Sequence, residues 1–267
     1  MKSNKKIPIA HKPTRRKQQL FFLGMLVLFI PCLFYLNLSF PQFTKGLERI
    51  PGIARQLLQI SLNELPELLT ELLTSVVVAF LCVVISVFFA LFLGFMMAEN
   101  TAPSKIAAKI LRACIVVIRT IPTTIWVLLA VASMGFGPMA GVIGLLFPTV
   151  SFLIKVFAEK IDEAGKDTVE AIRAAGGTWW HVVCNGVLPN SFPAFLALIA
   201  FKFEITVAET VILGMVGAGG IGVLLQEYIS FYEFAPLMLG VLVVFSTLFL
   251  LEMLTNLIRV RLTGSGR

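Results

Sequence analysis

Charged residues are scarce in this 267-residue sequence. They make up 14% of it, whereas a typical soluble domain has about 25%. Hydrophobic residues account for 58%, and the mean hydropathy is +0.92. Several apolar blocks are too long for the helices of a soluble globular domain. We therefore expect an all-α, polytopic integral membrane protein.

Residues that hold metals, cofactors or disulfides are few. The four cysteines show no CxxC or CxxxC spacing, and there are only two histidines. This spacing argues against a zinc site or a disulfide framework, so we interpret the cysteines as small packing residues. The sequence also lacks a GxxxxGK[ST] P-loop, HExxH, GxSxG and paired aspartates in its apolar segments. We expect no enzyme activity and no cofactor bound by this chain.

Positive charge is concentrated near one end of the chain. The net charge is +7, and seven of the 22 Lys and Arg residues lie between Lys2 and Lys17, directly before an apolar run. Others follow the ends of later apolar runs. This distribution is typical of a membrane orientation signal rather than of a nucleic-acid groove, so we expect lipid and not nucleic acid as a partner.

Six segments are long and apolar enough to cross a bilayer as helices, which takes roughly 20 residues each. They are residues 20–40, 72–98, 110–134, 139–156, 190–215 and 234–258. The first is longer than the apolar region of a signal peptide and no A-x-A site follows it, so we interpret it as a span. Threading these spans places 15 Lys and Arg residues on one side and only three on the other. Both termini are therefore expected in the cytoplasm.

The spans define the domain organisation. We expect a basic cytoplasmic tail over residues 1–19, a first span over 20–40, an outer connector over 41–71, a transmembrane domain over 72–258 and a cytoplasmic tail over 259–267. In and beyond the connector, residues 53–73 carry leucines at helical spacing, interrupted by Pro66. This pattern predicts an amphipathic helix that lies on the outer leaflet and leads into the second span.

The inner loop over residues 157–189 predicts two short helices. Asp167 followed by Glu170 resembles a capping box, so a helix should begin there. Gly176 and Gly177 should end this helix, with Gly176 letting the two helices pack closely. Next, Thr178 can cap a second one. Because such a protruding, partly apolar unit is costly to expose to water, we expect it to dock into another protein.

This loop resembles the cytoplasmic loop of ABC importer permeases, patterned EAA-x3-G-x9-I-x-LP. The matching residues are Glu170, Ala171, Gly176, Leu188 and Pro189, while Ile172 replaces the second alanine and Gly186 replaces the isoleucine. In that family the loop forms coupling helices that fit a cleft on a separate ATPase subunit. The resemblance implies a coupling role for the loop, namely Glu170, Ala171, Ile172, Gly176, Gly177, Leu188 and Pro189, and a type I, methionine-importer-like fold.

Between about residues 74 and 259 the chain is most similar to phosphonate-importer permeases. The stretches that carry this similarity are RTIP at 119–122, GFGP at 135–138, FKFE at 201–204 and LGMVGAGGIG at 213–222. The sequence departs from the family at 206–209, where TVAE stands in place of a basic residue. Methionine-importer permeases share the glycine run more loosely.

The resemblance implies a multi-pass permease in the bacterial inner membrane. Its partners would be a second copy of the chain, two ATPase subunits that use ATP and Mg, and an external solute-binding protein. The solute would be a phosphonate or a related phosphorus oxyanion, with methionine or another small solute as the alternative. A secondary transporter is a further alternative, but it would usually show internal repeats and more spans.

Ionisable residues inside apolar segments mark candidate pathway or gate positions. Lys202 and Glu209 are seven residues apart and share one helix face, whereas Glu204 points elsewhere. Structural ion pairs are the alternative interpretation. Arg119 lies nearer the middle of its span than a membrane anchor would, and Pro122 should kink that helix.

The run at 217–222 matches the dinucleotide-binding spacing GxGxxG. It follows an apolar segment of about 25 residues rather than a short strand, so no nucleotide is expected there. We expect Gly217, Gly219, Gly220 and Gly222 to break the fifth helix at a hinge or gate near the outer mouth. Simple tight packing of a turn remains the alternative.

Overall fold

The computed structural model describes residues 12–36, 39–163 and 166–264. Every regular element in these ranges is helical, which confirms the all-α prediction. The helices are α1 (Lys12–Tyr35), α2 (Phe40–Leu57), α3 (Leu65–Met97), α4 (Lys105–Thr120), α5 (Thr123–Met134), α6 (Pro138–Glu163), α7 (Lys166–Ala174), α8 (Trp179–His181), η1 (Val182–Val187), α9 (Leu188–Leu213), η2 (Gly214–Ala218), α10 (Ile221–Ser230) and α11 (Phe234–Gly264). The described residues up to Arg55 form one compact unit, and those from Gln56 onward form a second.

The amphipathic helix of the connector is α2, not the predicted segment at 53–73. α2 ends at Leu57, and the chain then runs through turns until α3 begins at Leu65. Pro66 lies in the first turn of α3. A proline is favourable there because the first backbone N–H groups of a helix have no partner inside it. Pro66 therefore starts a helix instead of interrupting one.

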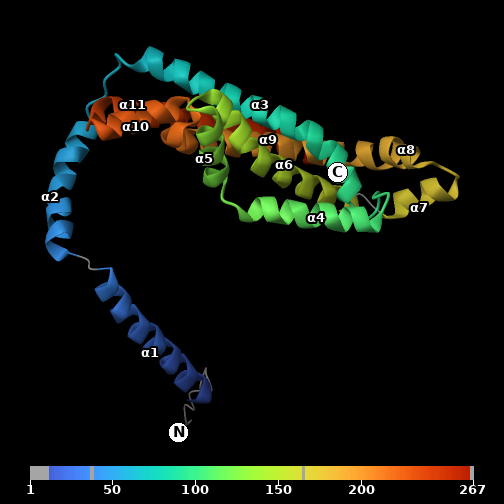
Figure 1. The fold of residues 1–267 in the computed structure, drawn as a ribbon, viewed down its shortest axis with the longest axis horizontal. Coiled ribbons are helices and arrows are strands. Elements are labelled where there is room, and N and C mark those ends of the chain that lie inside the picture. The colour runs from blue at the N-terminus through green and yellow to red at the C-terminus, as the bar shows by residue number, and fades with distance from the viewer. Residues whose placement is uncertain (1–11, 37–38, 164–165, 265–267) are drawn as a thin grey trace, which may run out of the picture. The chain divides into compact units, whose positions relative to one another are not determined.

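The second unit is a helix bundle in which α3 and α6 lie side by side, with α9 packed against both (Figure 1). The buried face of α3 carries small residues at helical spacing, among them Ser75, Ala79, Cys82, Ser86, Ala90 and Gly94. A Cβ on Gly94 would come within 3.2 Å of the Cβ of Phe157 on α6. Small residues let membrane helices approach closely, which replaces the hydrophobic drive that is missing in lipid.

The third predicted span is two helices rather than one. α4 and α5 are bent by 83° at the break over Ile121 and Pro122, so the predicted span over 110–134 is a bent pair and the predicted kink at Pro122 is confirmed. Ile121 is extended, as a residue before proline tends to be. The indole Nε1 of Trp126 donates to the Ile118 carbonyl at 3.3 Å and bridges the break.

The fifth predicted span is also broken, and here the prediction is confirmed. α9 ends at Leu213, η2 follows, and α10 turns away at 61° within the glycine run, at Gly219 and Gly220. α10 lies between the predicted spans 190–215 and 234–258. Within the described ranges, four helices are long and apolar enough to cross a membrane singly, or six spans result if each bent pair is counted as one.

Candidate coupling loop and translocation pathway

The loop between α6 and α9 folds as two short helices that project from one end of the bundle (Figure 1). α7 begins at Lys166, so Asp167 lies in its first turn and does not precede the helix as a cap. Gly176 has a φ of +81°, which a glycine adopts without strain, and the chain reverses there. The Thr178 backbone N–H then donates to Nδ1 of His181 at 3.2 Å across the first turn of α8. The predicted pair of helices is confirmed.

Close packing inside this loop comes from Gly177 and Gly186, not from Gly176. A Cβ on Gly176 would meet no atom within 4 Å, so the prediction that Gly176 brings the helices together is wrong. A Cβ on Gly177 would lie 2.5 Å from Cγ2 of Ile172, and one on Gly186 would lie 2.6 Å from Cδ1 of Ile172. The Ile172 side chain therefore holds α7 against the segment that leads into α9.

Two long-range hydrogen bonds tie the loop to the α3–α4 turn, and two more tie that turn to α6. The indole Nε1 of Trp179 donates to the Thr101 carbonyl at 2.6 Å, and Arg173 donates to the Asn100 carbonyl at 3.5 Å. Asn100 in turn donates its backbone N–H to Oδ1 of Asp162 at 3.1 Å and its side-chain amide to the Asp162 carbonyl at 3.0 Å. Sequence reasoning missed these residues because their partners are 62 to 78 positions apart. The loop, the α3–α4 turn and the end of α6 form one connected unit.

The outer surface of the loop carries mostly small side chains and one large exposed aromatic ring. Glu170, Ala171 and Gly176 are exposed, and Trp180 is 67% exposed beside the partly buried Trp179. Leu188 begins α9 and Pro189 lies in its first turn. A displacement of the loop therefore passes directly into the axis of α9. The predicted loop residues all lie in or directly after this unit.

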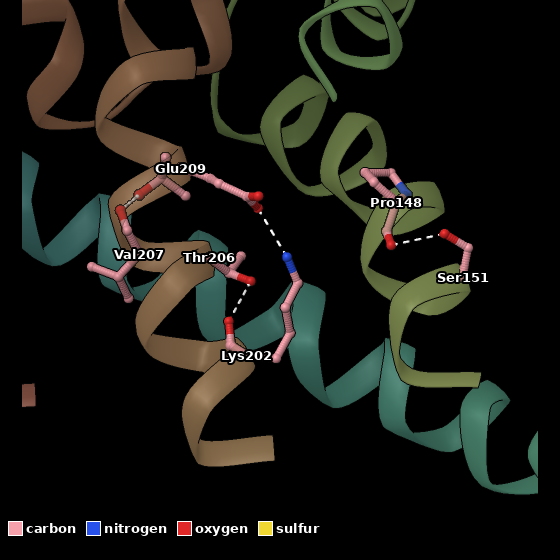
Figure 2. Close-up of polar contacts among 7 residues, drawn as sticks. Pro148, Ser151, Lys202, Thr206, Val207 and Glu209 are labelled. Atoms are coloured by element: carbon pink, nitrogen blue, oxygen red, sulfur yellow. Dashed lines mark hydrogen bonds and ion pairs between the residues drawn. The ribbon is translucent and has the colours of Figure 1, made fainter. Parts of the chain in front are cut away.

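Lys202 and Glu209 form an ion pair inside the bundle. Their Nζ and Oε2 atoms are 3.0 Å apart, and the side chains are 6% and 28% exposed (Figure 2). Lys202 Nζ also lies 5.6 Å from the centroid of the Phe152 ring on α6. The prediction that they share one face is confirmed. Glu204 points elsewhere, as expected, and lines a small pocket of about 220 Å³ together with Glu252 on α11.

Hydroxyl and thiol groups extend this polar region into the α3–α6 contact. The Cys82 thiol on α3 lies beside the hydroxyls of Ser86 and Thr149. The two hydroxyls are buried, and apart from this thiol they have no hydrogen-bond partner among the described residues. Because buried polar groups normally pair, they mark a place where water or another polar group is favourable. Among the described residues, no three metal-ligating side chains come together.

The glycine run packs tightly against the turn between α5 and α6. Gly217 has a φ of +107°, and a Cβ there would overlap the Phe136 ring. Its carbonyl accepts the backbone N–H of Gly137 at 3.0 Å. A Cβ on Gly219 would lie 2.9 Å from the backbone nitrogen of Pro138. Two of the motifs singled out in the sequence, 135–138 and 213–222, are therefore in direct contact.

The second half of the run packs against α3. Gly220 has a φ of +78°, and a Cβ there would overlap the Ser75 hydroxyl, which accepts the Ile221 backbone N–H at 3.0 Å. A Cβ on Gly222 would overlap the Val211 carbonyl. At each glycine from 217 to 222 a side chain would therefore collide with a neighbouring atom. The contacts join α3, α6 and α10 at one point. Whether this junction moves as a gate stays a prediction.

Arg119 lies apart from the other candidate pathway residues. It lines a groove of about 760 Å³ between α4, α6 and the α3–α4 turn, and neither Lys202 nor Glu209 contributes to that groove. Pro122 lies at the start of α5, just beyond it. The residues grouped from the sequence as one pathway thus fall into four places: this groove, the ion pair on α9, the small pocket of Glu204 and the glycine junction.

Comparison with known proteins gives a consistent match. The family model described as "Binding-protein-dependent transport system inner membrane component" matches residues 90–264. The phosphate-import permease protein PhnE of Mycolicibacterium smegmatis is 37% identical over 169 residues, which cover 63% of this chain and 32% of that protein. The phosphite transport system permease protein PtxC of Stutzerimonas stutzeri is 32% identical over 165 residues, covering 62% and 60%.

The fold has a counterpart among solved structures. A chain of the MetNI methionine ABC transporter, solved in inward-facing conformations, superposes with a TM-score of 0.69 and 18% identity, covering 76% of this chain and 99% of its own length. At this identity the likeness shows the fold alone. The 267-residue chain spans about a third of the length of the PhnE relative and just under two thirds of the length of the PtxC relative.

Proposed function

Since the chain belongs to the family of binding-protein-dependent transport system inner membrane components, we propose that it is the membrane-spanning permease subunit of an ATP-driven ABC importer. It forms the translocation pathway for a small solute in the bacterial inner membrane. The observation that carries this proposal is the family match over 90–264, because it contains the two-helix loop, the bent α9–α10 pair and the last span in one uninterrupted region.

The proposed partners follow from the same assignment. Two ATPase subunits that hydrolyse ATP with Mg bind the loop, a second copy of the chain completes the membrane pathway, and an external binding protein delivers the solute. With the Lys and Arg asymmetry of the sequence, the loop and both termini face the cytoplasm. The protruding small-sided surface of α7 and α8, with the exposed Trp180, supports docking of a separate protein there.

Two connections transmit movement of the ATPase subunits into the membrane. One is the continuous path from η1 into α9 at Leu188 and Pro189. The other runs from Trp179 and Arg173 to the α3–α4 turn, and from Asn100 to Asp162 at the end of α6. Because both connections leave the same compact loop, α3, α6 and α9 move together as near-rigid bodies.

For the solute, a phosphonate or a related phosphorus oxyanion is favoured. The relatives above are named for phosphate and phosphite, and both cover more than 60% of this chain at over 30% identity. Methionine is the second candidate because the MetNI methionine transporter shares the fold, although at 18% identity. A secondary transporter would need no docking surface for an ATPase, so the loop argues against it.

Reconstitution tests this assignment. The chain is placed in proteoliposomes with an ATPase subunit and a binding protein from the same organism, and uptake of labelled methylphosphonate, phosphite, phosphate and methionine is measured. The expected result is uptake of at least one phosphorus oxyanion that requires ATP and both partners. Uptake of methionine alone would overturn the solute, and uptake driven by an ion gradient without ATP would overturn the importer class.

A further inference from the structure

A groove of about 760 Å³ lies at the loop end of the bundle. It is lined by Met97, Glu99, Asn100, Arg112, Ile115, Val116, Arg119, Thr120, Lys155, Ala158, Glu159 and Asp162. Its volume falls within the range of roughly 300–1,000 Å³ that is usual for small-ligand sites. Half of the lining residues are ionisable, which is unusual in a bundle this apolar.

The charges of this groove are unequally paired. Arg112 lies 3.3 Å from Glu99, with side chains 50% and 70% exposed, and Lys155 lies 3.6 Å from Glu159. Such exposed pairs contribute little and open easily. Arg119 has no hydrogen bond or ion pair to any residue that the structure describes. Asp162 also lines the groove without a cation partner among the described residues, but it accepts the Asn100 backbone N–H. Arg119 is therefore the cation of the groove that is available to an external anion.

Arg119 is exposed at the end of α4. It is the penultimate residue of that helix, about 20 Å along the helix axis from Lys105, and the chain breaks directly after it. An arginine within a membrane-spanning segment normally faces a watery cavity or a partner. The groove supplies the cavity, and the planar guanidinium suits a bidentate contact with two oxygens of a phosphorus oxyanion.

We propose that this groove is a binding site for the transported oxyanion within the permease, with Arg119 as its principal ligand and Arg112 and Lys155 as flanking cations. This inference rests on the proposed function and names the place where the solute is held. The groove adjoins the α3–α4 turn, which hydrogen bonds to the coupling loop through Asn100 and Thr101. Movement of the loop therefore changes the walls of the site directly.

The Lys202–Glu209 pair is a weaker candidate for this role. Glu209 neutralises Lys202 at 3.0 Å, and Lys202 is almost fully buried against α6. An anion could bind there only by displacing a carboxylate from a closed, partly dehydrated pair, which is unfavourable. In the groove, no such displacement is needed at Arg119.

The test uses the full permease–ATPase–binding-protein complex with three variants of α4. Arg119→Gln removes the charge, Arg119→Lys keeps the charge but not the bidentate geometry, and Lys109→Gln removes a charge from the same helix outside the groove. Uptake of methylphosphonate and phosphite is measured, together with equilibrium binding of phosphite to the permease–ATPase complex without the binding protein. Copurification of the ATPase and the mass of the complex report folding and assembly.

We expect Arg119→Gln to lower uptake and phosphite binding at least tenfold, Arg119→Lys to lower them less, and Lys109→Gln to match wild type, with assembly unchanged in all three. Wild-type uptake by Arg119→Gln would overturn the site while leaving the proposed function intact. A smaller complex for Arg119→Gln would also overturn it, because Arg119 would then pair with a neighbouring subunit. Failure of the wild-type complex to carry any phosphorus oxyanion would instead overturn the proposed solute.

Discussion

The Ile172 side chain fills the space beside Gly186, because a Cβ on residue 186 would lie 2.6 Å from Cδ1 of Ile172. These are the two positions at which the loop departs from the EAA-x3-G-x9-I-x-LP pattern. The larger residue stands at 172 where the pattern has alanine, and the smaller stands at 186 where it has isoleucine. The two departures therefore compensate: the large side chain comes from position 172 instead of position 186, and the packing of the two-helix loop is preserved.

Compensation predicts a non-additive pair of variants. Gly186→Ile alone should overpack the loop at a cost of about 1–3 kcal/mol, and Ile172→Ala alone should leave a void. The double variant should recover most of the loss because it restores the family pattern on both sides. ATPase copurification and the melting temperature of the solubilised protein measure this. Losses that simply add would contradict the packing relationship.

For the Lys202–Glu209 pair we predict that removing one charge destabilises the protein more than removing both. Lys202→Met leaves Glu209 without its partner and should destabilise the protein by about 1–3 kcal/mol. Lys202→Met with Glu209→Gln should lose less than this single variant. The melting temperature followed by tryptophan fluorescence tests the order. Glu204→Gln is the matched control, since Glu204 lies in a separate pocket, and a melting temperature for Lys202→Met equal to wild type would remove the structural role of the pair.

The glycine junction predicts intolerance of a single methyl group. Gly220→Ala places a Cβ on the Ser75 hydroxyl and forces a positive φ on alanine, at a cost of about 1–3 kcal/mol. We expect a lower melting temperature and a lower yield of monodisperse protein. Gly46→Ala in α2 is the control, because a Cβ there meets nothing within 4 Å. Equal behaviour of the two variants would show that the junction is looser than its contacts indicate.

Trp180 predicts the position of the ATPase contact. The side chain is 67% exposed on the loop, and large aromatic residues commonly dominate binding energy at interfaces. Trp180→Ala should weaken ATPase binding about tenfold or more and leave membrane insertion unchanged. Trp179→Phe removes the hydrogen bond to Thr101 but keeps an aromatic ring beside Trp180, so it should bind the ATPase normally but uncouple hydrolysis from uptake. Normal ATPase affinity of Trp180→Ala would place the contact elsewhere on the loop.

Two substitutions at Gly176 distinguish the effect of charge from the effect of backbone strain at the same surface. Both Asp and Asn tolerate a positive φ better than other residues, and the site has open space for either. Gly176→Asp adds a second carboxylate near Glu170 and should abolish ATPase copurification and uptake while the protein still inserts into the membrane. Gly176→Asn, the isosteric control, should retain most binding. Equal copurification of both variants with the ATPase would mean that this surface does not face it.

Much of the architecture could be predicted from local sequence. Apolar length fixed the spans, since only a helix of roughly 20 residues satisfies its backbone across hydrocarbon. Pro122 and the glycines at 217–222 indicated both breaks because each restricts or frees a particular backbone angle. The spacing of seven residues placed Lys202 and Glu209 on one face, and Gly176 and Thr178 marked the turn of the coupling loop. These features depend on residues close together in the chain.

The tertiary structure decided which of these features meet. The Ser75 hydroxyl pairs with the Ile221 N–H across 146 positions, and Trp179 pairs with the Thr101 carbonyl across 78. The same packing places Arg119 in a groove that does not include Lys202, and it packs Ile172 against Gly186. Local patterns carry no information on such distances, because they are set by how closely small residues let the helices approach. The sequence by itself determined the helices and their breaks, and only their packing decided where a solute and an ATPase could be held.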